Sequence, residues 1–337
     1  MNPWNTPAER DYNRKIIDDE LNDFLPEKIF DAHIHVSPPD ELLGEVISCG
    51  GVPITSYTYE ELDADLQMAY PGRHVEALCF GLPSPKLNLE RHNGYVGSGA
   101  DFKKFFPLRL LDPARDNAEA VNTDIDRYRF LGLKPYPDYA RPNDIPNAEI
   151  PEMLPDWAME IAHDRRLLVM LHIPRPKRME DPLNRRQLRE LCTRWPGAKI
   201  ILAHVGRAYY LRGITGFLDD LRELPNLYFD LTMVQNWEVM SYLFQQVPIR
   251  KVLFGSDIPI ALAQGKAVEI NHQYTYVTPR PWPLSLCDEK NKLQFTSFLN
   301  EELRAIRQAS TAAKLTRTDV SAIFYDNARG LVDTIGF

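Results

Sequence analysis

The sequence has no long apolar run and few cysteines. No stretch approaches the roughly 20 apolar residues that a transmembrane helix needs, and residues 1–25 carry many acids without the apolar segment of a signal peptide. The four cysteines, Cys49, Cys79, Cys192 and Cys287, lie far apart and show no paired spacing. We therefore expect reduced thiols in a cytoplasmic protein that has no membrane anchor.

Positive charge is also scarce. The chain has 39 Lys and Arg against 47 Asp and Glu, a formal net charge of -8, which leaves no extended basic surface for nucleic acid. Residues 175–194 are rich in arginine, but acids interrupt them, so we interpret the segment as a solvated helix face from which an arginine could reach an anionic substrate. We expect a small-molecule substrate, with no nucleic acid or membrane partner. The sequence leaves assembly into a homo-oligomer open.

Eight short apolar runs of strand length recur along the chain. Segments with helical spacing or charge separate them, an alternation that is typical of parallel βαβ units. The continuous apolar character of the runs indicates strands covered on both faces. The runs are residues 28–36, 75–81, 104–111, 130–136, 166–173, 199–206, 226–232 and 251–258. The clearest helical segments between them are residues 116–129, 154–164, 184–195, 214–224 and 237–247.

This alternation predicts an α/β fold, specifically a (β/α)8 TIM barrel. An open, doubly wound sheet is the competing architecture, but the first run is followed by VSPPDELLG, which lacks a glycine-rich phosphate-binding turn. We expect one domain over residues 1–337, with an N-terminal helical extension over 1–27 and lid-like insertions at about 37–74 and 259–283. Both insertions follow the carboxyl ends of strands, where barrels assemble their active sites.

Ionisable residues lie near the carboxyl ends of several apolar runs. An unpaired buried charge costs several kcal/mol, so such residues indicate a functional site. His33 and His35 alternate along the first strand and therefore point to the same face, into the barrel. Two neutral imidazoles in this arrangement can chelate a divalent ion such as zinc, usually together with a carboxylate. In the alternative interpretation they are partly buried histidines that bond to backbone carbonyls.

Further polar residues end later strands. His172, His204 and Asp257 close the fifth, sixth and eighth runs. Each alone is more typical of a structural histidine or a turn-forming aspartate, but their shared position at one end of a barrel favours a site. Lys134, in the fourth run, could be a metal-bridging carboxylated lysine, a cation for a substrate carboxylate, or a residue that reaches to solvent. Tyr136 lies on the same strand face and could contribute its hydroxyl.

Other residues near the strand ends have supporting roles. Asp31 lies deeper in the first strand than His33 and could orient a ligand histidine. Three arginines are candidates for binding an anionic substrate, although each could equally be a surface or ion-paired residue: Arg109, Arg207 and Arg280.

With these residues the sequence resembles the amidohydrolase superfamily, in particular the amidohydrolase-related (amidohydrolase 2) branch of metal-dependent hydrolases and decarboxylases. The resemblance runs from about Phe30 to Val332. It is specific for the superfamily and weak for the substrate. The motifs that carry it are FDAHIHV, RLLDPARDNAEAVNTDIDRYRFLGLKPYP, MLHI, ILAHVG, LFGSDIP and YDNARGLV.

The resemblance implies a metal site with four ligands. These ligands are His33, His35, His172 and Asp257. Asp257 would also accept the proton of the attacking water, and His204 would act as a base, polarise the carbonyl or, with Lys134, hold a second ion. We expect zinc, with manganese or another divalent ion as the alternative, and leave open one ion or two. Lys134, Tyr136 and Arg207 are the expected substrate-binding residues.

Three functions are compatible with this site. The leading hypothesis is a metal-dependent hydrolase of a lactone, ester or amide in a small carboxylated molecule. The alternative is a non-oxidative decarboxylase of an aromatic or unsaturated acid, and Lys134 favours hydrolysis because the decarboxylases of this branch generally lack a lysine there. A catalytically silent binding barrel is the third, and the intact ligand set argues against it.

Overall fold

The computed structural model describes residues 5–39, 47–84, 86–142 and 145–336. Part of the first predicted insertion, residues 40–46, and the side chain of Cys49 lie outside that description. In the described ranges, no helix is both long enough and apolar enough to cross a membrane.

Parallel strands form a closed ring of eight. One sheet has the order β1-β4-β5 and the other β11-β10-β9-β8-β7-β6. β5 and β6 are two halves of one strand separated by Leu108, so they join the sheets on one side. On the other side, β1 pairs with the residues after β11 through a parallel bridge between Ile34 and Ile258, and Ala32 N–H donates to Phe254 O at 2.9 Å. The (β/α)8 prediction is confirmed.

The strands of the ring agree with the eight predicted runs. They are β1 (Lys28–Val36), β4 (His74–Gly81), β5 (Phe105–Pro107), β6 (Arg109–Leu111), β7 (Gly132–Pro135), β8 (Leu168–Leu171), β9 (Lys199–Leu202), β10 (Leu227–Asp230) and β11 (Val252–Leu253). Their residues are almost all buried, because the ring interior lies on one side and the helical layer on the other.

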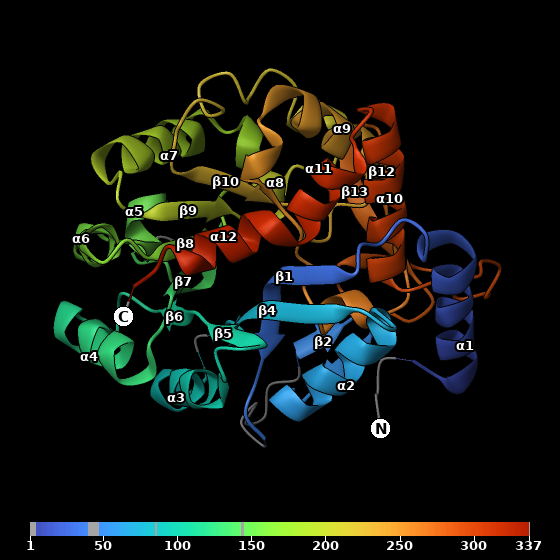
Figure 1. The fold of residues 1–337 in the computed structure, drawn as a ribbon, viewed down its shortest axis with the longest axis horizontal. Coiled ribbons are helices and arrows are strands. Elements are labelled where there is room, and N and C mark those ends of the chain that lie inside the picture. The colour runs from blue at the N-terminus through green and yellow to red at the C-terminus, as the bar shows by residue number, and fades with distance from the viewer. Residues whose placement is uncertain (1–4, 40–46, 85, 143–144, 337) are drawn as a thin grey trace.

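Helices surround this ring (Figure 1). The longer ones are α1 (Pro7–Ile16), α2 (Tyr59–Ala69), α3 (Leu89–Gly99), α4 (Ala118–Tyr128), α6 (Asp156–Asp164), α7 (Pro182–Arg194), α9 (Trp237–Gln246), α10 (Phe298–Ala312) and α12 (Asn327–Asp333). The short ones are η1 (Ile17–Leu21), η2 (Pro137–Tyr139), α5 (Ile150–Met153), η3 (Arg178–Glu180), α8 (His204–Arg207), η4 (Leu211–Gly213), η5 (Ile249–Lys251), η6 (Ile260–Leu262), α11 (Arg317–Ser321) and η7 (Ala322–Asp326). Four of the five predicted helical segments are confirmed.

The helix predicted over residues 214–224 is wrong. The structure has a series of turns there, between η4 and β10. Gly216 adopts a left-handed φ of 78°, which interrupts a right-handed helix. Ile214, Leu218 and Leu221 are fully buried all the same. Their helix-like spacing therefore arises from turns that bury these side chains in the core, and it led to the wrong prediction of a helix.

The two predicted insertions carry structure of their own. After β1 the chain forms the hairpin of β2 (Ile47–Cys49) and β3 (Val52–Ile54), followed by α2. After β11 it forms a three-stranded sheet with the order β12-β13-β14, which the sequence did not predict and which extends beyond residue 283. Its strands are β12 (Lys266–Ile270), β13 (Gln273–Thr278) and β14 (Ser285–Cys287). The lid function of both insertions stays a prediction.

The N-terminal helix is fastened to the barrel. Thr6 caps α1 in a capping box with Glu9. Asn13, further along α1, accepts hydrogen bonds from the Thr296 hydroxyl at 2.9 Å and from Ser297 N–H at 3.0 Å, where α10 begins. Figure 1 shows α1 in dark blue on the side of the molecule where α10 and the inserted sheet lie. These contacts hold α1 against the start of α10, and the single-domain organisation stays a prediction.

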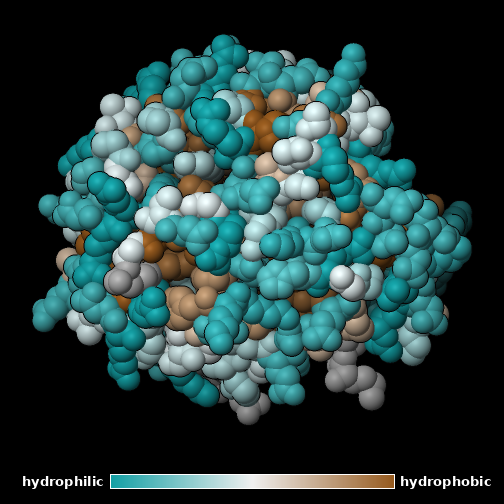
Figure 2. Space-filling view, viewed as in Figure 1, coloured by the Kyte–Doolittle hydropathy of each residue, from teal (hydrophilic) through white to brown (hydrophobic). Residues whose placement is uncertain are grey.

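Large apolar side chains are exposed in and beside the inserted sheet. The face drawn in Figure 2 is mostly hydrophilic, with smaller hydrophobic groups between the polar side chains. Several large apolar side chains that are more than half exposed lie in or beside the inserted sheet: Ile270, Leu284, Leu286 and Leu293.

Candidate metal centre

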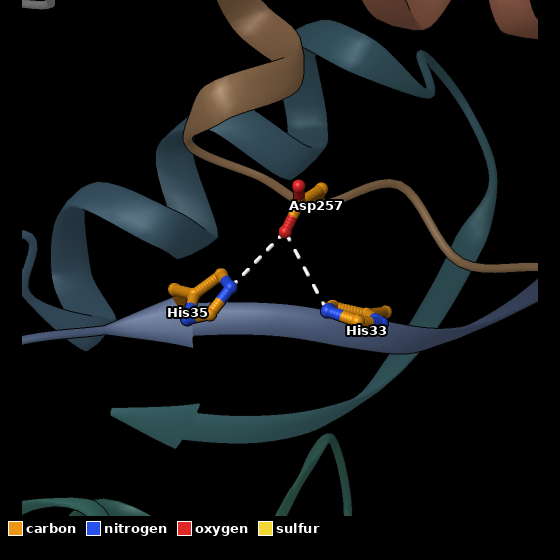
Figure 3. Close-up of side chains that lie close together, drawn as sticks. All are labelled: His33, His35 and Asp257. Atoms are coloured by element: carbon orange, nitrogen blue, oxygen red, sulfur yellow. Dashed lines mark hydrogen bonds and ion pairs between the residues drawn. The ribbon is translucent and has the colours of Figure 1, made fainter. Parts of the chain in front are cut away.

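Two histidines and one aspartate converge at the carboxyl end of the ring. His33 and His35 project from β1 toward Asp257, which follows β11 (Figure 3). Nε2 of His35 lies 3.0 Å, and Nε2 of His33 3.5 Å, from Oδ1 of Asp257. One ligand atom from each residue lies within 4.8 Å of the others, and all three residues are buried. A single divalent ion can bind between donors at this spacing.

The backbone around Asp257 is held in an uncommon conformation. Its φ of 73° is left-handed, which is rare for a residue other than glycine. Its N–H donates to the carbonyl oxygen of His33 at 2.8 Å, so the ring closure between β1 and the eighth strand positions the carboxylate. Residues in such conformations cluster at functional sites.

The other nitrogen of each imidazole already has a partner. Nδ1 of His33 lies 2.9 Å from Oδ2 of Asp230, and Nδ1 of His35 lies 2.9 Å from the carbonyl oxygen of Gly81. Because a carboxylate and a carbonyl accept, we assign the proton to Nδ1 in both rings, which leaves the Nε2 lone pairs facing Asp257. Burial holds the pKa of His33 well below its ordinary value, so this ring is neutral.

The arrangement of these lone pairs around Asp257 indicates whether the site can hold a cation. A neutral Nε2 that faces an ionised carboxylate oxygen is repelled unless a positive charge lies between them. Burial raises the pKa of Asp257, but a hydrogen bond that Nε2 of His35 would donate when no ion is bound, together with the nearby histidines, holds this pKa below its usual range, so the carboxylate is ionised. The site therefore fits a divalent ion, whose histidine ligands characteristically donate their second N–H to an acceptor.

Asp230 is a site residue that the sequence interpretation missed. It ends β10, holds His33 as described, and accepts a hydrogen bond from the backbone N–H of His204 at 2.6 Å. Its signal was visible, because NLYFDLT carries an acid near the end of an apolar run, as the eighth run does.

Asp31 supports the backbone of the site. Its Oδ1 accepts from His33 N–H at 3.2 Å and from Ser256 N–H at 2.9 Å, and Tyr70 donates its hydroxyl to Oδ2 at 3.3 Å. Burial raises the pKa of Asp31 to about 7. Asp31 thus ties the backbone of β1 to the segment before Asp257. The imidazole of His33, which Asp31 was expected to orient, is held by Asp230.

His204 lies beside the compact group. Its Nδ1 is 2.9 Å from the carbonyl oxygen of Thr232, which accepts the N–H and leaves Nε2 with its lone pair. The ring centroid lies 4.9 Å from that of His33 and 5.1 Å from that of His172. Burial lowers the pKa of His204, although Asp257 and Asp230 oppose the shift. A neutral ring with a free Nε2 suits a base or a metal ligand.

His172 is near the compact group of three residues but does not belong to it. Its Nδ1 is buried and has no hydrogen-bond partner in the described residues. Burial, followed by the charge of Arg207, holds the pKa of His172 well below its ordinary value. A buried, neutral imidazole nitrogen without a hydrogen-bond partner suits a metal ligand. Its ligand role stays a prediction.

Lys134 is fully buried inside the ring. Its Nζ lies 3.4 Å from Nε2 of His33 and 4.4 Å from the centroid of the Phe80 ring. Burial lowers the pKa of Lys134 to about 7, against the opposing charges of Asp230 and Asp257. The interpretation in which its side chain reaches to solvent is wrong. Tyr136 lies on the same wall, with its hydroxyl 3.4 Å from Nε2 of His35.

The three candidate arginines differ in how far they are committed elsewhere. Arg109 is buried in ion pairs with Asp116 at 2.7 Å and Asp124 at 2.8 Å, so it does not serve the substrate. Arg280 pairs with Glu9 of α1 at 2.8 Å. Arg207 is half-buried and donates to the carbonyl oxygen of Ile173 at 3.2 Å, beside His172.

The fold and the site define a class. A closed (β/α)8 barrel with histidines and a carboxylate at the carboxyl ends of its strands is the architecture of barrel enzymes whose active sites lie on that face. The chain belongs to the amidohydrolase family, whose sequence profile matches residues 30–333. The resemblance seen in the sequence is confirmed. A search of curated proteins finds no match.

Solved structures of similar fold include enzymes of two reaction types. A Burkholderia multivorans amidohydrolase with bound zinc is 11% identical, with a TM-score of 0.58 over 90% of this chain and 99% of that one. A probable 2-pyrone-4,6-dicarboxylic acid hydrolase from Acinetobacter baumannii is 11% identical, with a TM-score of 0.55 over 90% and 99%. A 2,6-dihydroxybenzoate decarboxylase is 13% identical, with a TM-score of 0.51 over 93% and 100%. At these identities the likeness concerns the fold.

Proposed function

We propose that this protein is a metal-dependent hydrolase that breaks a C–O or C–N bond in a lactone, ester or amide of a small carboxylated molecule. The observation that carries the proposal is the convergence of Nε2 of His35 and Nε2 of His33 on Oδ1 of Asp257, at 3.0 Å and 3.5 Å. A set of imidazoles and one carboxylate suits zinc, with manganese or another divalent ion as the alternative.

Each residue has a defined part in the proposed reaction. His33, His35 and Asp257, with His172, would hold the ion. Such an ion supplies Lewis acidity and lowers the pKa of a coordinated water toward 7. The carboxylate of Asp257 takes the proton of the attacking water and returns it to the leaving group.

Whether the site holds one ion or two depends on whether His204 and Lys134 act as ligands of a second ion. Nε2 of His204 is a base or a ligand as it stands, and it could polarise the substrate carbonyl only after it takes a proton. Burial lowers the pKa of Lys134 to about 7, so the neutral amine is accessible at physiological pH, and a carbamate formed from this amine and carbon dioxide would supply a carboxylate to a second ion.

The proposal is tested on purified protein that is reconstituted with zinc or with manganese. Metal per chain is measured first, and then turnover on panels of carboxylated lactones, esters and amides, with His33→Ala as the control. We expect hydrolysis that a chelator abolishes and the added metal restores. Carbon dioxide released from aromatic acids without any hydrolysis would instead assign the barrel to the decarboxylases.

A further inference from the structure

An arginine and two tyrosines from three separate connections meet near the metal centre. Arg178 lies in η3 after β8, Tyr209 follows α8, and Tyr274 lies on β13 of the inserted sheet. The two tyrosine rings stack with centroids 4.3 Å apart. The guanidinium carbon of Arg178 lies 4.5 Å from the Tyr274 centroid and 5.3 Å from that of Tyr209, and its Nη2 donates to the Tyr274 hydroxyl at 3.1 Å.

The guanidinium of Arg178 is incompletely bonded. Its Nε is buried and has no hydrogen-bond partner in the parts of the chain that the structure describes. A buried charged donor without an acceptor is costly and uncommon in native proteins. The residue is also held at a left-handed φ of 51°. A ligand carboxylate that accepts from Nε and a neighbouring Nη would satisfy this group in the bidentate geometry that arginine favours.

The other arginines of the basic segment are engaged elsewhere. Arg175 pairs with Asp181 at 2.9 Å, and Arg185 donates to the carbonyl oxygen of Met179 at 2.6 Å. Arg186, Arg189 and Arg194 are exposed and lie near acids. Within residues 175–194, Arg178 is thus the arginine that turns toward the site.

This cluster lies next to the predicted catalytic residues. The centroid of the Tyr209 ring is 6.2 Å from that of His204. Burial raises the pKa of the Tyr209 hydroxyl, and the charge of Asp257 raises it further. The charges of Arg207 and Arg178 lower it, so Tyr209 lies within electrostatic range of both Asp257 and Arg178. Arg178 and Tyr274 are half-buried, whereas His33 is fully buried, so the cluster is on the more accessible side of the centre.

We propose that Arg178, seated on the Tyr209–Tyr274 pair, binds the carboxylate of the substrate and selects for anionic substrates. This proposal rests on the proposed function, because it names the substrate group that the same site recognises. Tyr274 makes the inserted sheet part of the site, since the hydroxyl of this tyrosine holds Nη2 of Arg178 while Nε is left for the ligand.

The test compares the binding of benzoate and of its neutral analogue benzamide by titration calorimetry on zinc-loaded protein. Arg178→Met should weaken benzoate binding by about tenfold or more, the scale of a charge-assisted bidentate pair, and leave benzamide unchanged. Arg178→Lys keeps the charge without the fork and should fall between. Arg186→Gln, an exposed change in the same segment, should match the wild type.

Several results would overturn the proposal. One is equal benzoate binding by wild type and Arg178→Met, which would place the carboxylate on the metal. Another is an equal loss of benzoate and benzamide, which would mean that Arg178 only holds the structure, and a third is no benzoate binding by the wild type at about 10 mM. If benzoate binding depends on Arg178 while hydrolysis is absent from every panel, the proposed function fails and the carboxylate site stands.

Discussion

The imidazole of His33 on β1 depends on an aspartate from β10, two strands away around the ring. Asp230 accepts the Nδ1 proton and so presents Nε2 to the metal. Asp230→Asn offers an amide of the same shape with a weaker acceptor, and a flipped amide would present a donor. We expect metal affinity to fall by about 10- to 100-fold, measured by competition with a chelating dye. Asp126→Asn, at an exposed ion pair, is the control, and wild-type affinity in Asp230→Asn would contradict the role.

The predicted ligands should matter for the reaction more than for the fold. His33→Ala or Asp257→Ala removes a donor at the end of a strand, where barrels place catalytic groups. We expect metal content and turnover to be lost while the far-ultraviolet circular dichroism spectrum and a cooperative thermal transition persist. A variant that is already unfolded at ordinary temperature would show that these residues hold the barrel together.

At the scale of elements, the side chain of Asn13 joins α1 to the start of α10. Asn13 satisfies the N–H of Ser297, the residue that caps α10. Asn13→Ala leaves that donor and the Thr296 hydroxyl without their partner, and we expect a loss of about 1–3 kcal/mol in the free energy of unfolding. Urea denaturation measures it. Asn122→Ala, on the surface of α4, should stay within about 0.5 kcal/mol of the wild type, and a similar result for Asn13→Ala would show that this side chain does not stabilise the fold.

Elements with a local signal could be predicted from the sequence. Strands buried on both faces give continuous apolar runs, and these runs located every strand of the ring. The turns over residues 214–224 and the inserted sheet could not be predicted in this way. Turns that bury apolar residues imitate helical spacing, and β12 is mostly exposed, so it carries no apolar periodicity.

The site shows the same division between strands and loops. His33, His35 and Asp257 could be predicted because ionisable groups at the ends of apolar strands are conspicuous. Arg178 and Tyr274 could not be chosen from the sequence, since both lie outside the barrel strands and only tertiary contact brings them together. Arg109 illustrates the opposite error, because the two aspartates that neutralise it follow it in the chain and their pairing is visible only in the fold.

At the scale of the whole molecule, stabilising contacts lie at the amino end of the ring and the candidate site lies at its carboxyl end. Near the amino end of β4, Glu76 accepts a hydrogen bond from the Tyr325 hydroxyl at 2.6 Å and pairs with Arg329 at 2.9 Å, which ties the C-terminal helices to the ring. The carboxyl end carries the candidate metal centre, including Asp257 with its left-handed φ. We therefore expect that mutations at one end change stability and mutations at the other change chemistry, as the ligand variants test.

Global stability should also depend on pH through a buried acid of α10. Glu302 is fully buried, and its Oε2 accepts from Met233 N–H at 2.9 Å. Burial, with further contributions from Asp31, Asp230 and Asp257, raises the pKa of Glu302 well above 4.5. The folded state then binds this proton more tightly than the unfolded state does. Its stabilising contribution is complete below pH 4.5 and is lost as the pH rises toward the folded pKa.

Glu302→Gln keeps the acceptor for Met233 and removes the ionisation. We expect the free energy of unfolding of this variant to decline less between pH 5 and pH 8 than that of the wild type, measured by urea denaturation in saturating zinc, because neither state can gain a charge at this position. Glu238→Gln, on an exposed part of α9, should follow the wild-type profile. Parallel profiles for Glu302→Gln and the wild type would mean that Glu302 is ionised in the folded protein and that the metal centre compensates its charge.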